Sequence, residues 1–475
     1  MARLVVVSNR VPNERGARAG GGAVALADAL TPGALWFGWS GKRTAATSET
    51  AVVKEADGIT FATIDLSEAD HAQFYAGFSN SALWPLLHLR TGLFTYRRED
   101  YEGYRRVNRA FAQALRPLLR DDDLIWIHDY QLFPLAAELR VLGVTNRIGF
   151  YLHIPFMPSI VLQVLPTAAE LVSTLCAADV VGFQTQRDRD NFFETLRELL
   201  GGAVTDGEHV WLGTHNVRAV VVPAGIDTHG FSAMAARAAR GVDTRRLVES
   251  LAGRVLAIGA DRLDYTKGLP NRFEAFSRLL SHYPEHVRQI SLLQVAARSR
   301  EEVHEYRDLR RELDRKTGDI NGRFSDFDWV PIRYMTRTLS RRTLAGFYRV
   351  ARIGLVTPLR DGMNLVAKEF VAAQNHHDPG VLILSCFAGA AETMTEALIV
   401  NPYDAEAVAR TIHDALGMSL NERRERHGAL FAKICRDNAA VYCQRFLTYL
   451  AEAHVSFRGY RFLDLTASHK SHKNL

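Results

Sequence analysis

The amino-acid sequence predicts an α/β protein made of two doubly wound, Rossmann-like domains that face each other across a cleft. Its 475 residues exceed what one hydrophobic core usually organises, and two domains is the economical division. Short β-branched runs alternate with longer amphipathic stretches, which is typical of parallel sheets covered by helices on both faces. The series breaks near residue 238, where an Ala/Arg-rich stretch separates one set of runs from the next.

The apolar runs are the expected strands. In the first half they are RLVVVSN, DLIWIHD, RIGFYLHI, DVVGFQT and RAVVVPAGI, and in the second half RVLAIGA, QISLLQVA, RIGLVTP and GVLILSCF. We assign residues 1–238 to the first domain and 239–455 to the second, with the last helices packing back on the first. Residues 456–475 are polar and basic and are expected to form a flexible tail. Ligands of such sheets bind beyond the carboxyl ends of the strands, so the residues that follow each strand are the candidate site.

Composition excludes several classes of protein. With 47% hydrophobic and 23% charged residues, the chain is neither disordered, fibrous nor disulfide-rich. A net charge of +5 is too small for a protein that coats nucleic acid, so any anion recognition should be local. Four widely spaced cysteines, a short N-terminal apolar run and the lack of a span of roughly 18 apolar residues predict a cytoplasmic protein without a membrane partner.

Cations and glycines follow several of the expected strands. Gly20, Gly21 and Gly22 precede a small-residue helix, where they fit either a phosphate-binding loop or a merely tight turn. Arg262 and Lys267 lie in the loop after RVLAIGA and together suit a diphosphate, although either alone would ordinarily be a solvated surface charge. Pro270 is placed to start the next helix.

Arginines mark two further positions. Arg298 and Arg300 follow QISLLQVA, and Arg341 falls at an expected helix start. The forked guanidinium group is well suited to phosphate oxygens, so more than one phosphate is expected.

Two carboxylates belong to the stretch TPLRDGMNLVAKEF, which follows a buried strand and continues into an expected helix. Glu369 falls beside the apolar stripe of that helix, so it is a salt-bridged residue, a solvated edge position or an acceptor for ligand hydroxyls. Asp361 stands at the mouth of the strand. The triplets DRD at 188–190 and DFD at 326–328 fit polar helix-start and loop positions better than metal ligands.

Many short motifs occur in an order and spacing that resembles the trehalose-6-phosphate synthases, the retaining glycosyltransferase family 20 with the GT-B fold. They include VVVSNR, LWFGWSG, FSNSALWPLLH, IWIHDYQL, IGFYLHIPF, DRLDYTKGLP, TPLRDGMNLVAKEF and ALIVNPYD, and they span about residues 3 to 450. Departures from the family pattern are VAARSR, Cys386 in SCFAGAA, and a short loop after Arg10.

The resemblance implies an activity: transfer of glucose from a nucleotide-glucose, usually UDP-glucose, to glucose 6-phosphate, giving α,α-trehalose 6-phosphate. It also implies a homo-oligomer such as a tetramer. Because cations would stabilise the leaving diphosphate in place of a metal, no metal or other cofactor is expected. The nucleotide base, whether uracil, guanine or adenine, stays open.

The resemblance also implies a role for individual residues on the donor side. Glu369 would accept hydrogen bonds from ribose hydroxyls, because an ionised carboxylate is acceptor-only. The diphosphate would be held by Gly21, Arg262, Lys267 and Arg341, and the donor glucose and diphosphate by Asp361, Gly362, Met363, Asn364 and Leu365 at a helix N-terminus.

On the acceptor side, Arg10 and Arg300 would bind the phosphate, Tyr75 and Trp84 would close the pocket, and Asp129 would contact the sugar. His153 would contact the donor glucose, and Trp39 is a further lining candidate. The residues implied for catalysis are Arg262, Lys267, Asp361, His153 and Asp129. Judged on residue type alone, residues such as Tyr75 and Trp84 more often pack in a core, and a histidine such as His153 more often has a structural role, so these assignments depend on the motifs.

Three other functions stay open at this point. A sister synthase would use another phosphorylated acceptor, such as glycerol 3-phosphate. A catalytically silent sugar-phosphate sensor is disfavoured because Arg262, Lys267, Asp361 and Glu369 are all present. An NAD-linked oxidoreductase is disfavoured because no GxGxxG follows the first strand.

Overall fold

A computed structural model describes residues 2–11, 30, 32–204, 206–212, 215–299 and 304–453. The chain forms two compact units, one of Met1–Pro223 with Cys443–Leu475 and one of Ala224–Tyr442. Each unit contains a sheet with parallel strands and helices in the connections between them. The predicted α/β class with two doubly wound units is therefore confirmed.

The sheet of the first unit has the strand order β3-β4-β2-β1-β5-β6-β7-β10-β9-β8. Its central strands pair in parallel, and antiparallel strands complete both ends. The sequence pattern does not indicate these edge strands, because they are short or solvated and lack a continuous apolar run; the exposed β3 is an example. The strands are β1 (Leu4–Arg10), β2 (Leu35–Thr44), β3 (Val52–Ala56), β4 (Ile59–Ser67), β5 (Leu124–His128), β6 (Arg147–Tyr151), β7 (Val180–Phe183), β8 (Ala203–Val204), β9 (His209–Leu212) and β10 (His215–Val221).

A π-helix, η1 (His71–Leu83), distinguishes the helical layer of the first unit. Side chains reinforce its wide turns, because Asn80 Nδ2 and Ser81 Oγ donate to carbonyls five residues earlier, at 2.8 and 2.9 Å. Long π-helices are rare and often mark functional segments. The other helices are α2 (Glu68–Asp70), α3 (Trp84–Leu87), η2 (Thr91–Leu93), α4 (Arg98–Leu115), η3 (Arg116–Leu118), η4 (Tyr130–Leu132), α5 (Leu135–Val141), α6 (Ser159–Leu162), α7 (Ala168–Leu175) and α8 (Gln186–Leu200).

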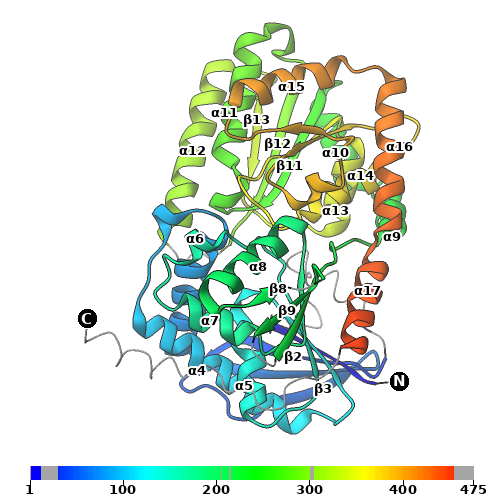
Figure 1. The fold of residues 1–475 in the computed structure, drawn as a ribbon. Coiled ribbons are helices and arrows are strands. Elements are labelled where there is room, and N and C mark those ends of the chain that lie inside the picture. Colours follow the sequence, from blue (N-terminus) through cyan, green and yellow to red (C-terminus); the bar gives the residue numbers. More distant parts are fainter. Residues whose placement is uncertain are drawn as a thin grey trace. The chain divides into compact units, whose positions relative to one another are not determined.

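The sheet of the second unit is parallel, with the order β13-β12-β11-β14-β15-β16. Leu256 and Ile258 of β11 face a core that includes residues of α9, α10, α13, α14 and α16. Gly259, the residue after Ile258, points to the opposite face and lies against Arg272 of α11, which packs with α12 and α15 on that face of the sheet (Figure 1). The strands are β11 (Val255–Arg262), β12 (Ile290–Ala297), β13 (Ile332–Met335), β14 (Ile353–Val356), β15 (Val381–Ser385) and β16 (Leu398–Val400).

Two helices of the second unit begin at the positions that the sequence predicts. Pro270 lies in the first turn of α11, and Arg341 is the first residue of α13, capped by Ser340. The helices are α9 (Thr228–Ala238), α10 (Val242–Leu251), η5 (Tyr265–Lys267), α11 (Leu269–His282), η6 (Pro284–His286), α12 (His304–Phe324), α13 (Arg341–Val350), α14 (Leu365–Ala373), η7 (Gly389–Glu392), α15 (Ala405–Gly417), α16 (Leu420–Arg436) and α17 (Ala439–Glu452). Among the described residues, every helix is too short or too polar to cross a membrane.

The division between the units follows Pro223 and so differs from the boundary expected near residue 238. The reason is α9, which packs against α13 and α14 and whose Thr228 hydroxyl donates to the Ile434 carbonyl at 2.8 Å. The Ala/Arg-rich stretch therefore belongs to the second unit and does not link the two. The expected tail from residue 456 lies outside the described residues.

The last helix among the described residues, α17, carries the chain back into the first unit. Its Phe446 stacks on Trp126 of β5, with ring centroids 4.7 Å apart. Gly149 of β6 and Gly182 of β7 make room for this ring, because a Cβ atom on either would lie within 2.7 Å of it. The core of the first unit thus includes a residue that follows the whole second unit in the sequence.

Candidate active site

The predicted site residues divide between the two units. Gly21 and Arg300 lie outside the described residues. The first unit contains Arg10, Tyr75, Trp84, Asp129 and His153, and the second contains Arg262, Lys267, Arg341, Asp361, Gly362, Met363, Asn364, Leu365 and Glu369.

Arg10 ends β1 beside a group of aromatic rings. Its Cζ lies 5.5 Å from the ring centroid of Trp39, the residue with which it pairs in β2. The Trp39 ring is 6.4 Å from Tyr75 and 5.1 Å from His71, centroid to centroid. A Cβ atom on Gly41 would lie 2.5 Å from the Arg10 guanidinium, so glycine makes room for the cation there. The Trp39 ring is therefore a flat aromatic wall for the cation, and Tyr75 and His71 adjoin that ring.

Trp84 is placed differently. It is buried and packs against His88 and Tyr130, with ring centroids 4.1 and 5.5 Å away. Trp84 therefore packs as a core residue, which is one of the two interpretations that its residue type allows. Tyr130 directly follows Asp129, so this packing supports the segment that carries the carboxylate.

Asp129 and His153 follow neighbouring strands. Asp129 has a φ of 77°, and its N–H donates to the Tyr151 carbonyl at 2.9 Å. Its Oδ1 accepts from the His153 N–H at 3.3 Å. Since Ser8 of β1 pairs with His128 of β5, Arg10 and Asp129 also follow neighbouring strand ends. Arg10, Asp129 and His153 therefore share the carboxyl edge of the sheet, as predicted from the strand pattern.

His153 and His128 form a pair of neutral imidazoles. His153 Nε2 lies 3.0 Å from His128 Nδ1. Burial lowers the pKa of His153 to about 4, and it holds the pKa of His128 well below its ordinary value. One ring can therefore donate a hydrogen bond to the other at neutral pH. The motif WIHDY contains His128, but nothing in the sequence pattern indicates this contact.

In the second unit, Lys267 and Asp361 contact each other directly. The Asp361 carboxylate is ion-paired with the Lys267 ammonium and also accepts from Asn364 Nδ2 at 2.9 Å. Asn364 has a left-handed backbone, with a φ of 70°, and its side chain does not cap α14. The Asn364 carbonyl accepts from the Ala367 N–H at 3.2 Å, so the N–H groups of this turn that an anion could reach are those of Leu365 and Val366. Gly362 and Met363, which precede them, are buried.

The buried carboxylate of Asp264 organises the loop that presents the two cations. Asp264 Oδ1 accepts from the N–H and the hydroxyl of Thr266, at 3.0 and 2.9 Å. Its Oδ2 lies 4.0 Å from an Arg262 nitrogen. The Thr266 carbonyl in turn accepts from the Leu359 N–H at 2.7 Å, which joins this loop to the one that carries Asp361.

Gly268 allows the two loops to approach so closely. It has a φ of 64°, and a Cβ atom there would lie 2.5 Å from the Thr357 carbonyl oxygen. Glycine avoids both the left-handed strain and the clash.

Arg341 and Glu369 form a half-buried ion pair, with Nε 3.3 Å from Oε1. The guanidinium also lies over the Phe231 ring, 5.0 Å from its centroid. Burial raises the pKa of Glu369, and the charge of Arg341 opposes that rise. The salt bridge that the sequence left open for Glu369 is thus present, and it favours the ionised, acceptor-only form of the carboxylate.

A buried network adjoins these residues in the sequence, and the sequence pattern did not predict it. Arg272 of α11 lies 2.5 Å from Asp261 and 2.8 Å from Gln294, and its Nε donates to Thr357 at 3.0 Å. Asp261 precedes Arg262, and Thr357 opens the loop that leads to Asp361. The helical spacing of Arg272 could have indicated that it is buried. It falls on the apolar face of α11, whose buried residues include Leu269, Phe273 and Phe276.

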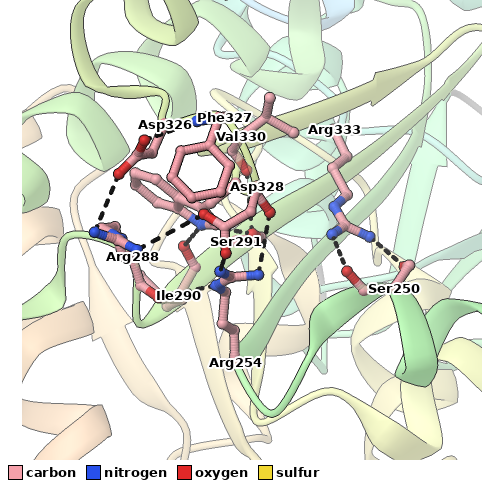
Figure 2. Close-up of polar contacts among 11 residues, drawn as sticks. Ser250, Arg254, Arg288, Ile290, Ser291, Asp326, Phe327, Asp328, Val330 and Arg333 are labelled. Carbon is pink, nitrogen blue, oxygen red and sulfur yellow. Dashed lines mark hydrogen bonds and ion pairs between the residues drawn. The ribbon is translucent and has the colours of Figure 1, made fainter.

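The two acidic triplets occupy the predicted kinds of position. Asp188 lies in the first turn of α8 and accepts from the Thr185 hydroxyl at 2.6 Å. Asp326 and Asp328 lie in the loop between α12 and β13, where their carboxylates pair with Arg288 and Arg254 (Figure 2). These guanidinium groups take the place that a cation would need at the second triplet.

Comparison with known proteins decides the family. The sequence model described as glycosyltransferase family 20 matches residues 5–452. The chain belongs to glycosyltransferase family 20. A family 20 relative, the trehalose-6-phosphate synthase of Sodalis glossinidius, is 45% identical over 450 residues, which cover 94% of this chain and 95% of the relative.

Solved structures agree with this family 20 membership. A UDP-forming α,α-trehalose-phosphate synthase from Burkholderia xenovorans, in complex with glucose-6-phosphate, matches with a TM-score of 0.92 at 44% identity over 95% of this chain and 100% of the other. A structure from E. coli, named for trehalose-6-phosphate and bound with UDP-2-fluoro glucose, matches with a TM-score of 0.90 at 42% identity over 95% and 99%. The chain is a glycosyltransferase, and the predicted GT-B fold is confirmed.

Proposed function

We propose that this glycosyltransferase moves glucose from UDP-glucose to glucose 6-phosphate with retention of configuration, giving α,α-trehalose 6-phosphate and UDP. The observation that carries the proposal is that Arg262, Lys267 and the start of α14, which has no side-chain cap, all lie at the carboxyl edge of the second unit's sheet. Relatives that are 42–44% identical bind a UDP-glucose analogue and glucose-6-phosphate.

The donor diphosphate would bind to Lys267, Arg262 and Arg341 and to the first N–H groups of α14. Breaking the glucose–phosphate bond leaves additional negative charge on the diphosphate, and preorganised cations stabilise that charge. In the structure Asp361 holds the Lys267 ammonium in place. We assign Asp361 to hydroxyls of the donor glucose, with Gly362, Met363, Asn364 and Leu365 forming the adjoining backbone and Gly21 a further contact to the diphosphate.

Glu369 would accept hydrogen bonds from the ribose hydroxyls of UDP. Arg341 favours the ionised form of this carboxylate, and an ionised carboxylate can accept two hydroxyl donors. Arg341 would therefore bind the diphosphate directly and would also favour ribose binding by keeping Glu369 ionised.

The acceptor would bind in the first unit. Arg10 and Arg300 would hold the 6-phosphate, Tyr75 would form a wall, and Asp129 would accept from a sugar hydroxyl. Trp84, which is buried, supports this region from the core. His153 would contact the donor glucose through its ring or backbone.

The reaction then exchanges two bonds at one carbon. The bond from glucose C1 to the phosphate oxygen breaks, a bond from C1 to the acceptor hydroxyl oxygen forms on the same face, and the hydroxyl proton passes to the leaving phosphate. His153 is a poor base for this proton, because burial lowers its pKa to about 4. This supports the leaving phosphate as the base.

Product analysis tests the function. The expected product from UDP-glucose and glucose 6-phosphate is α,α-trehalose 6-phosphate, identified by NMR. Free glucose should have a kcat/KM lower by on the order of a hundredfold or more, because its complex leaves the phosphate-binding cations without their anion. Efficient transfer to free glucose would contradict the Arg10 and Arg300 assignment, and a preference for glycerol 3-phosphate would identify a sister synthase. Parallel assays with GDP-glucose and ADP-glucose determine the base.

Metal independence is a separate prediction. The cationic residues already supply positive charge at the diphosphate, so transfer should continue at an unchanged rate in EDTA and metal-free buffer. Loss of activity that magnesium or manganese restores would contradict this prediction.

Two further parts of the proposal concern the protein in the cell. The wide spacing of its four cysteines supports a cytosolic location. A homo-oligomer such as a tetramer stays a prediction, and light scattering of the purified protein measures it.

A further inference from the structure

Two imidazoles and a carboxylate converge in the second unit, away from the residues assigned to the donor. Glu285 and His286 belong to η6, which precedes β12, and His413 lies near the end of α15. Segments that lead into parallel strands lie at their amino ends, whereas the donor residues follow the carboxyl ends. The cluster and the donor residues are therefore at opposite edges of the same sheet.

The ligand atoms of this cluster are close to one another. His286 Nε2 lies 2.9 Å from His413 Nδ1, and His413 Nδ1 lies 3.6 Å from Glu285 Oε1. One ligand atom from each of the three side chains fits within a mutual distance of 4.8 Å. A tetrahedral ion with bonds of about 2.0–2.2 Å separates its ligand atoms by roughly 3.3–3.6 Å, so side-chain adjustments of a few tenths of an ångström would suffice for the two measured pairs.

Neighbouring groups orient the cluster without filling it. The Tyr283 ring stacks on His413, with centroids 4.1 Å apart and planes 16° apart, which fixes the plane of that imidazole. The His286 N–H donates to the Tyr283 carbonyl at 3.0 Å, which tightens the η6 turn. Glu285, His286 and His413 all line a surface cavity of about 960 Å³, so an ion has access from solvent.

We propose that Glu285, His286 and His413 form a binding site for a divalent transition-metal ion such as Zn²⁺ or Co²⁺. Two imidazoles and one carboxylate suit these ions, whereas Mg²⁺ and Ca²⁺ prefer ligand sets made of oxygen alone. Three protein ligands leave one tetrahedral position for a water molecule from the cavity. The ion would join η6 to α15 through His286 and His413, which are 127 residues apart in the sequence.

This site is distinct from the proposed transfer reaction. The donor residues are cations and a helix start, and the EDTA prediction above requires no metal for turnover. The ion would instead brace the turn between α11 and β12 against α15.

Cobalt titration of the full-length, tag-free protein tests the proposal. Co²⁺ added to metal-free protein should give saturable visible absorption at one equivalent, and Zn²⁺ should displace it while excess Mg²⁺ should not. His286→Ala and His413→Ala should each weaken binding at least about tenfold, because each removes a direct ligand. His304→Ala is the matched control, since it removes an exposed histidine of the same unit that lies 2.9 Å from Asp308.

A second measurement guards against misfolded variants. Zn²⁺ should raise the unfolding temperature of wild type and of His304→Ala, and it should leave that of His286→Ala and His413→Ala unchanged. Circular dichroism and transferase activity in EDTA establish that the variants are folded. Absence of saturable cobalt absorption in wild type, or equal binding by His413→Ala, would overturn the proposal.

Discussion

Lys267→Ala should lower kcat by on the order of a hundredfold or more, the usual result of removing an electrostatic contact to developing charge. Arg262→Ala should have an effect of the same kind. The lysine variant should be the more impaired, because Lys267 is ion-paired with Asp361 and its loss leaves that carboxylate beside the diphosphate site. Steady-state kinetics with UDP-glucose and glucose 6-phosphate measures both variants.

The control for this experiment is Lys433→Ala. Lys433 pairs with Glu396 at 2.7 Å in the same unit, so its removal also breaks a lysine–carboxylate pair. We have assigned it no role in the donor site, and its kcat should stay within about twofold of wild type, as for a partly exposed ion pair. Turnover of folded Lys267→Ala at the level of Lys433→Ala would disprove the assignment of Lys267.

Arg272→Ala should destabilise the second unit by about 3–5 kcal/mol, because it leaves the buried Asp261 carboxylate without its cation. Asp261 and Arg272 are both buried, and Arg272 also binds Gln294 and Thr357. Arg272→Lys should recover only part of the stability, since an ammonium cannot replace the three directed contacts of the guanidinium. Trp329 is the one tryptophan between residues 224 and 442, and the other five belong to the first unit. The difference in fluorescence between each variant and the same variant carrying Trp329→Phe, followed during urea unfolding, therefore measures the effect in the second unit.

Arg315→Ala provides the comparison for stability. Arg315 and Asp319 form an exposed pair within α12, at 3.0 Å. Such pairs contribute little, so this variant should unfold at the urea concentration of wild type. Equal unfolding midpoints for Arg272→Ala and Arg315→Ala would show that the buried network does not hold the unit together.

Much of the fold could be predicted because the central strands are buried on both faces. RLVVVSN, DLIWIHD and RVLAIGA became β1, β5 and β11 since no other element accommodates such runs as well. The solvated β3 and the π-helix η1 could not be predicted in the same way. The first lacks an apolar run, and the second depends on contacts five residues apart that have no simple residue pattern.

The sequence could predict which residues belong to the candidate site, but it could not predict the contacts among them. Residues that follow strands, such as Asp129 and Arg262, could be located because the carboxyl edge of a parallel sheet is where ligands bind. The pairing of Lys267 with Asp361 joins residues 94 positions apart, and it depends on the approach that Gly268 permits. Periodicity within a segment carries no information about such distances.

Because α17 returns to the first unit, the two units cannot complete their folding in the order in which they begin in the sequence. Phe446 lies over Gly149 and Gly182, so the first unit acquires this part of its core only after all of the second unit has been synthesised. The second unit, by contrast, is continuous in sequence from Ala224 to Tyr442. On the ribosome, the first unit therefore starts to emerge before the second but is completed after it. A nascent chain ending at Pro223 lacks Phe446 and exposes the apolar surface that this ring covers.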